Sequence, residues 1–160
     1  MRLKNLYKFK PEQKGWHTAM TRDKFKLIHS DLIMQVQCIE NDLKMIYAGM
    51  HSGDFDRNLD MLEKANLGTV IKKLKDLDYS DGHPDLSKQD YALLEQIREI
   101  RNYWCHQCYL DYTYIQDEYQ RERKFQQVAQ RLSEDENRTW DLHQHLQQLR
   151  LKMLRRYNRI

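Results

Sequence analysis

The chain contains 160 residues, which is enough for one domain with a hydrophobic core and too short for two domains of the usual size. Only 5 Gly and 2 Pro, together with 32% charged residues, leave few helix breakers and few sheet turns, so the composition predicts an all-α protein. Three Cys, an odd number, favour free thiols over a disulfide-stabilised secreted protein. No apolar run approaches the roughly 20 residues that span a bilayer, and the first residues lack the pattern of a secretion signal. We therefore expect a cytoplasmic protein without membrane contact.

Positive charge is concentrated at the two ends of the chain. The formal net charge is +3, but residues 1–14 hold five Lys and Arg against one Glu, and residues 146–160 hold five Lys and Arg and no acid. The residues between them therefore carry a net negative charge. Basic ends suit contact with phosphate groups, but they are also typical of ordinary solvated helix ends.

The first predicted helix is long and amphipathic. From Phe25 to Met50 the apolar residues recur every three or four positions without interruption. Thr21 is a suitable N-cap, and the polar residues 51–54 supply the turn after the helix. Shorter helical segments are expected within 59–77, with an interruption at residues 66–68.

Two capping patterns divide the second half of the chain. Residues 78–85 are rich in turn formers and predict a loop, and Ser87 with Asp90 resembles a capping box that opens the next helix. That helix buries an apolar stripe ending at Trp104, and its helical pattern continues through an aromatic stretch to Leu132. Ser133 to Glu136 forms a second capping box, which predicts the start of a last helix.

These elements predict an antiparallel, up-and-down bundle of about four long helices with additional short helical segments. We expect residues 1–160 to form one domain. Its parts are a basic N-terminal extension at 1–20, a bundle core at 21–132 and a basic C-terminal helix at 133–160.

The residues that point to chemistry are Arg101, Asn102 and His106, in the segment Arg-Asn-Tyr-Trp-Cys-His. Arginine stays charged and holds phosphate oxygens in a bidentate manner, whereas the unperturbed pKa of histidine lets it exchange protons near neutral pH. A fixed cation beside a proton carrier suits phosphodiester chemistry. An Arg and a His at this spacing are also common on solvated helix surfaces, so the context decides between the two interpretations.

That context resembles the HEPN superfamily, the higher eukaryotes and prokaryotes nucleotide-binding domain. The shared features are a long first helix, the segment 67–74, a polar loop, and 97–102 followed by His106. The resemblance covers the organisation of residues 21–132. It implies a helical bundle that dimerises around the motif and, in members with this motif, a metal-independent ribonuclease of toxin-antitoxin, stress or antiviral systems.

The resemblance implies roles for three residues and a set of partners. His106 would transfer the proton of a ribose 2′-hydroxyl, Arg101 would stabilise charge on the phosphoryl oxygens, and Asn102 would orient the imidazole or bind the RNA backbone. The partners are an RNA substrate, a second copy of the chain and an antitoxin or defence protein, and neither a metal nor a cofactor is required. Some toxin members carry a modified tyrosine two positions after the histidine, where this chain has Cys108, and Tyr109 comes one later.

The spacing of the motif gives an independent geometric argument. Five residues separate Arg101 from His106, which places them roughly 140° apart around a regular helix, whereas Asn102 and His106 lie about 40° apart. One straight helix therefore does not gather all three side chains. Either the helix is broken within 103–105, or a two-fold axis near this segment brings two copies of the motif into one cleft.

Other interpretations remain open from the sequence. The aromatic residues around the motif, Tyr103, Trp104, Tyr109 and Tyr112, suit base stacking or, more commonly, a core or dimer contact. Cys105 and Cys108 with His143 and His145 suggest a zinc site, although the spacing of the two histidines suits a strand better than a helix. The alternative function is a non-catalytic HEPN-like module that binds a nucleotide, RNA or a protein, and a plain helical scaffold with a basic C-terminal helix is a weaker third.

Overall fold

The computed structural model describes residues 19–158, which form six α-helices and no strand. The three long helices are α1 (Arg22–Met50), α4 (Lys88–His106) and α6 (Glu118–Arg156), and the shorter ones are α2 (Phe55–Asp60), α3 (Leu67–Asp78) and α5 (Leu110–Thr113). The predicted all-α bundle is confirmed. The predicted basic extension at 1–20 lies almost entirely outside the described residues.

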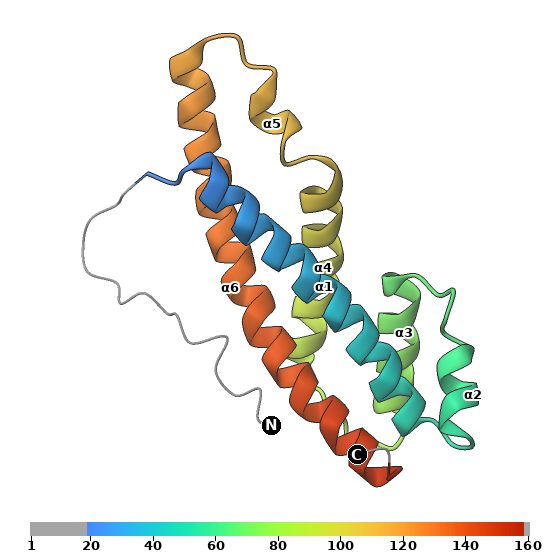
Figure 1. Ribbon diagram of the computed structural model, residues 1–160. Coiled ribbons are helices and arrows are strands. Elements are labelled where there is room, and N and C mark those ends of the chain that lie inside the picture. Colours follow the sequence, from blue (N-terminus) through green and yellow to red (C-terminus); the bar gives the residue numbers. More distant parts are fainter. Residues whose placement is uncertain (1–18, 159–160) are drawn as a thin grey trace, which may run out of the picture.

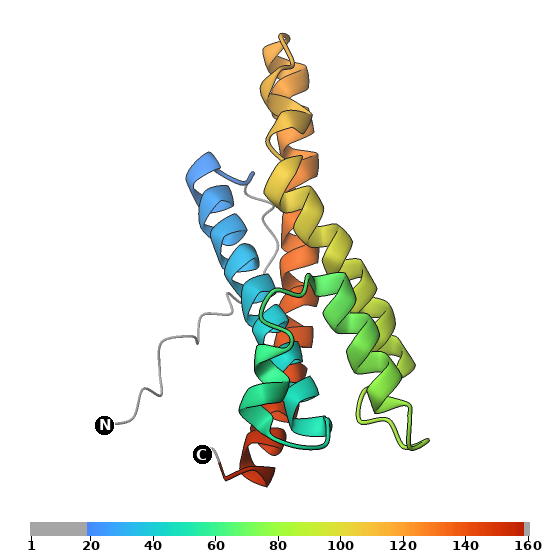
Figure 2. The same ribbon diagram turned by 90° about the vertical axis from the view of Figure 1, so that its right-hand side faces the viewer.

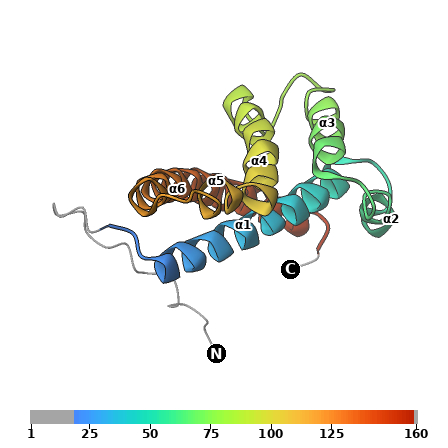
Figure 3. The same ribbon diagram turned by 90° about the horizontal axis from the view of Figure 1, so that it is seen from above.

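The long helices pack side by side along most of their length (Figure 1). α1 and α6 make the most extensive contact and run in the same direction, while α4 packs against both and runs in the opposite direction. Figure 2 shows α3 beside α4, and Figure 3 shows α1 lying across the bundle with α2 near the C-terminal end of α1. Within residues 19–158, no helix combines the length and the apolar character that a membrane span requires.

Local sequence explains where the helices begin. Thr21 caps α1 by accepting a hydrogen bond from the Lys24 backbone N–H, as its position before the apolar stripe predicts. Ser87 and Asp90 form the predicted capping box at α4, in which each side chain accepts from the backbone of the other residue. The predicted loop is confirmed for residues 79–85, whereas Asp78 is the last residue of α3.

The second predicted capping box is wrong, because α6 continues without interruption from Glu118 to Arg156. Ser133 lies within this helix, and its hydroxyl donates to the Ala129 carbonyl one turn earlier. Two of the acids that follow it contact other helices: Asp135 accepts a hydrogen bond from Trp104 of α4, and Glu136 accepts one from Gln35 of α1. The helix boundary lies instead at residues 114–117, where Asp117 caps α6. Residues 133–156 are therefore the second half of a longer helix.

The core is continuous across the bundle. Apolar side chains from α1, α3, α4 and α6 meet in one cluster, and the largest fully buried side chain is Trp104 of α4. α1 and α6 approach closely at Gly49, where an added Cβ would lie 2.8 Å from the Cβ of Met153. This core fixes the rotation of α4, so it also determines which residues of α4 face outward.

Candidate functional site

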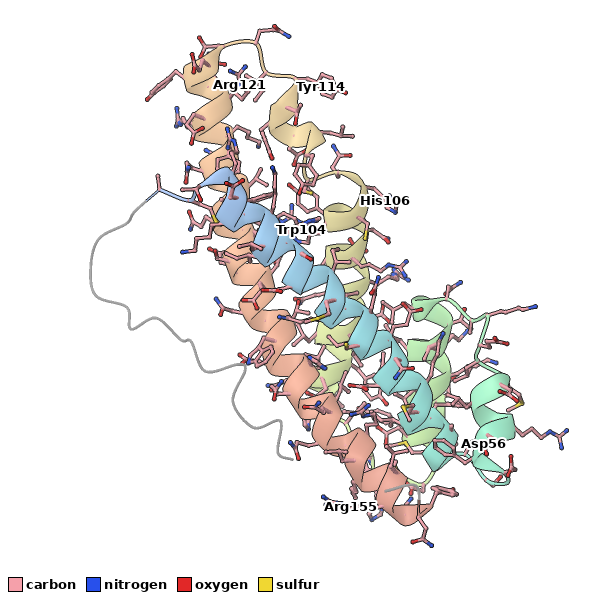
Figure 4. The ribbon with its side chains drawn as sticks, in the orientation of Figure 1. Asp56, Trp104, His106, Tyr114, Arg121 and Arg155 are labelled. Carbon is pink, nitrogen blue, oxygen red and sulfur yellow. The ribbon has the colours of Figure 1, made fainter. Side chains whose placement is uncertain are left out.

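The predicted motif lies at the C-terminal end of α4, on the side that faces away from the core. Burial of Ile97, Ile100 and Trp104 fixes this rotation. Asn102 and His106 are therefore exposed, while Arg101 is partly covered. Figure 4 shows His106 projecting from the end of α4 on the side away from α1.

α4 is unbroken through the motif. It remains helical to His106, and the backbone N–H of its C-cap Gln107 donates to the Tyr103 carbonyl in the usual helical manner. Arg101 and His106 therefore keep the separation of roughly 140° that a regular helix imposes. Of the two arrangements that the spacing allowed, a break within 103–105 is contradicted, and a shared site between two copies remains.

The structure brings Arg101 and Asn102 together and adds a residue that sequence analysis missed. Nη2 of Arg101 donates to Oδ1 of Asn102 over 3.3 Å, and Nη1 lies 3.7 Å from Oε2 of Glu40 on α1. Glu40 and Arg101 are both only partly exposed. This ion pair restrains the guanidinium between α1 and α4. No sequence motif identifies Glu40, because only tertiary packing places it beside Arg101.

His106 differs from the other two residues because its side chain has no hydrogen bond or ion pair with any residue in 19–158. Both ring nitrogens are therefore available to a substrate or to a second protein chain. A histidine that stabilised this fold would be expected to contact other residues of it. Exposure and the lack of a partner make His106 the residue of the motif best placed for proton transfer.

Two aromatic residues behind the motif hold the helix and do not bind a ligand. Trp104 is buried, and its Nε1 donates to the buried Asp135 of α6 over 2.9 Å. Tyr112 is also buried, so the structure contradicts base stacking by either ring. Tyr103 is half-buried and donates its hydroxyl hydrogen to Asp111, while the Arg131 guanidinium lies 3.6 Å from its ring centre.

The exposed aromatic side chains near the motif lie further along the chain. Tyr109 is 39% exposed, and its hydroxyl lies 3.5 Å from Nδ1 of His29. Tyr114 and Tyr119, in and just after the α5–α6 connection, are 74% and 77% exposed and were not predicted. Helical spacing does not mark this connection, because the apolar pattern predicts one helical run through to Leu132.

The four residues of the suggested zinc site do not meet. His143 lies near Asp42 and His145 lies near Asp90, both on contacts between helices, and Cys105 is exposed at the end of α4. Among the described residues, no group of three or more His, Cys, Asp or Glu is placed to hold a metal ion.

Cys108 is buried below the motif, and its thiol donates to the Trp104 carbonyl. Burial raises the pKa of Cys108 to about 11, so the thiol stays protonated at neutral pH. A buried neutral thiol is a poor metal ligand and a poor nucleophile, so Cys108 supports the helix end by packing.

The end of α4 thus presents a restrained Arg101–Asn102 pair and, roughly 140° away around the same helix, an exposed His106 without a partner among the described residues. Comparisons with protein-family models, with curated proteins and with solved structures give no match for this chain. Its chemistry must therefore be inferred from its own residues.

Proposed function

We propose that this protein is a metal-independent endoribonuclease of the HEPN type, which acts in the cytoplasm in a toxin-antitoxin, stress or antiviral defence system. The observation that carries the proposal is the exposed, unpartnered His106 on an unbroken helix that also presents Arg101 and Asn102. A histidine with free ring nitrogens supplies the proton transfer, and an arginine supplies the fixed charge.

The proposed reaction is an intramolecular transfer at phosphorus. The imidazole of His106 removes the proton from a ribose 2′-hydroxyl, and the oxygen attacks the adjacent phosphorus atom. Arg101 stabilises the charge that develops on the phosphoryl oxygens, and Asn102 holds the guanidinium by its hydrogen bond. The bond from phosphorus to the 5′-oxygen breaks, that oxygen receives a proton, and the products are a 2′,3′-cyclic phosphate and a 5′-hydroxyl.

The proposed site is shared between two copies of the chain. Because α4 is straight, the side chains of Arg101 and His106 diverge and do not flank one phosphate within one subunit. A two-fold axis near the end of α4 would place both copies of the motif in one cleft, with one histidine acting as the base and the other as the acid.

The test uses single-stranded RNA in the presence of EDTA. Wild type is expected to cut it into products with 2′,3′-cyclic phosphate ends, and to leave a fully 2′-deoxy strand of the same sequence intact. His106→Ala and Arg101→Ala are each expected to lower the rate by about 100-fold or more. His83→Ala is the matched control, because His83 lies in the exposed loop at the opposite end of α4.

Several outcomes would contradict the proposal: cleavage that needs a divalent ion, cleavage of the deoxy strand, or full activity in both motif variants. If the wild type cuts no RNA but forms dimers that His106→Ala disrupts, the non-catalytic HEPN-like binding module becomes the better explanation.

A further inference from the structure

Two stripes of residues run along the outer face of α1 and α6, and each recurs in alternating steps of four and three residues, the spacing of a coiled-coil contact. The α1 stripe consists of Leu27, Asp31, Met34, Cys38, Asn41 and Met45. The α6 stripe consists of Ser133, Asn137, Trp140, Gln144, Gln147 and Leu151. A groove around the buried Asp42 lies between the two helices, and residues of both stripes, among them Cys38 and Gln147, line it. The stripes and the groove therefore form one continuous surface, the α1–α6 face.

Large apolar side chains on the α1–α6 face lie outside the core. Leu27 is 68% exposed and Met34 is 42% exposed. Trp140 and Leu151 are half-buried, but neither packs against a hydrophobic cluster of the described residues. Figure 3 shows α3 and α4 on one side of α1, and the exposure of Leu27 and Met34 places the α1 stripe on the other side. An apolar surface of this kind is typical of a contact with another molecule.

The distribution of charge indicates what kind of molecule covers the α1–α6 face. Asp31 is the only charged residue in either stripe, although 15 of the 39 residues of α6 are Asp, Glu, Lys or Arg. The stripes contain no Lys or Arg, which disfavours a nucleic acid or an anionic membrane, because both bind mainly through basic side chains. Depletion of charge is typical of the buried centre of a protein–protein interface. The face therefore fits a protein partner.

The α6 stripe also suits contact with a copy of itself. In a two-fold interface the same patch lies on both sides, so a patch of one charge sign would repel its counterpart. The side chains of Gln144 and Gln147 carry no charge, and each amide can both donate and accept hydrogen bonds. The α6 stripe is therefore complementary to itself.

We propose that the α1–α6 face binds the same face of a second copy of the chain about a two-fold axis. Each stripe spans about 27 Å of helix, and two adjacent helices are about 20 Å wide. Two such faces bury about 1,000 Å² in total, near the lower limit for a specific interface, so we expect a Kd in the micromolar range. A copy bound here leaves the end of α4 uncovered, because α4 lies on the other side of α1. The contact is therefore independent of the proposed function, and a protein that uses both contacts forms a closed tetramer.

The test measures the mean mass of the full-length protein by sedimentation equilibrium over a range of concentrations. Met34→Glu and Gln147→Glu each add a charge to the contact, and each is expected to halve the mass that wild type reaches at the highest concentration. Gln147→Glu keeps the size of the side chain, so its fold should be retained, which circular dichroism checks. Met61→Glu is the matched control, because Met61 is 52% exposed and lies just after α2, outside the α1–α6 face. This control is expected to keep the wild-type mass. The halving is expected whether wild type is a dimer or a tetramer, so the result does not depend on the site proposed at the end of α4.

Cys38 reports on the same contact, because it lines the groove between the stripes. Its alkylation by N-ethylmaleimide, followed by mass spectrometry, is expected to slow with rising concentration of wild type but not of Gln147→Glu. Wild type that stays monomeric at every concentration would overturn the proposal, and slow alkylation of Cys38 in such a monomer would assign the face to another part of the same chain. An unchanged mass in either Met34→Glu or Gln147→Glu, or an equal loss of mass in Met61→Glu, would overturn it as well.

Discussion

The two ends of α4 differ in whether their exposed titratable side chains are paired. At the N-terminal end, Ser87 and Asp90 cap each other, the Tyr91 hydroxyl donates to the buried Asp78, and Asp90 accepts a hydrogen bond from His145 of α6. At the C-terminal end, His106 has no partner among residues 19–158. The difference indicates a division of roles, because polar groups that are satisfied within the chain stabilise the fold, whereas exposed unpaired groups remain available for other molecules.

The largest loss of stability is expected when the Asp78 side chain is removed. Its carboxylate accepts hydrogen bonds from the backbone N–H groups of Asp85 and Leu86 and from the Tyr91 hydroxyl. Asp78→Ala leaves these donors unpaired in a buried place, and we expect the free energy of unfolding to fall by about 3 kcal/mol in urea titrations. A loss below about 0.5 kcal/mol would show that the N-terminal end is not the stabilising one.

A smaller loss of stability is expected when the N-cap residue of α4 is substituted. Ser87→Ala removes the side chain that accepts from the Asp90 backbone N–H, and should lower the free energy of unfolding by about 1 kcal/mol. Ser133→Ala is the matched control, because Ser133 lies inside α6 and alanine is favoured there. Thermal unfolding of both variants checks the contrast. Equal losses would mean that the cap contributes nothing specific.

The capping carboxylate also makes stability depend on pH. Burial acts to raise the pKa of Asp90, but hydrogen bonds from Ser87 and His145 outweigh it and lower the folded pKa below the usual 3.8. The stabilisation is therefore fully present above pH 3.8 and is lost as the pH falls through the folded pKa. The difference in the free energy of unfolding between wild type and Asp90→Asn should therefore become smaller in urea titrations at acidic pH. A constant difference between pH 7 and pH 2 would contradict this.

The smallest effect on stability is expected at the other end of α4. His106→Ala removes an exposed side chain without partners, and should change the free energy of unfolding by less than about 0.5 kcal/mol. Urea titrations of this variant and of Asp78→Ala measure the two free energies of unfolding side by side. A loss of about 1 kcal/mol or more, on the order of a lost helix cap, would show that His106 has a structural role.

Local patterns predicted the fold better than the site. The apolar period and the caps at Thr21 and Ser87 are local signals, and the structure confirms them. The same pattern at Ser133 failed because it lies inside an apolar stripe that continues through it, and packing against α1 and α4 overrides the cap.

The exposure of Asn102 and His106 agrees with helical periodicity, because both lie off the stripe of Ile97, Ile100 and Trp104. The contact of Glu40 with Arg101 and the groove around Asp42 did not follow from it. Both depend on how helices far apart in the sequence are rotated against each other. The spacing of residues along one sequence does not predict that rotation.

The central claim is that the free end of α4 is half of a site completed by a second copy. It is tested most directly by titrating wild type at fixed concentration with an excess of the Arg101→Ala, His106→Ala double variant under conditions of complete subunit exchange. If sites are shared, mixed dimers replace wild-type dimers and the rate of RNA cleavage falls well below that of wild type alone. An unchanged rate after exchange would mean that each subunit carries a complete site, and would contradict the account.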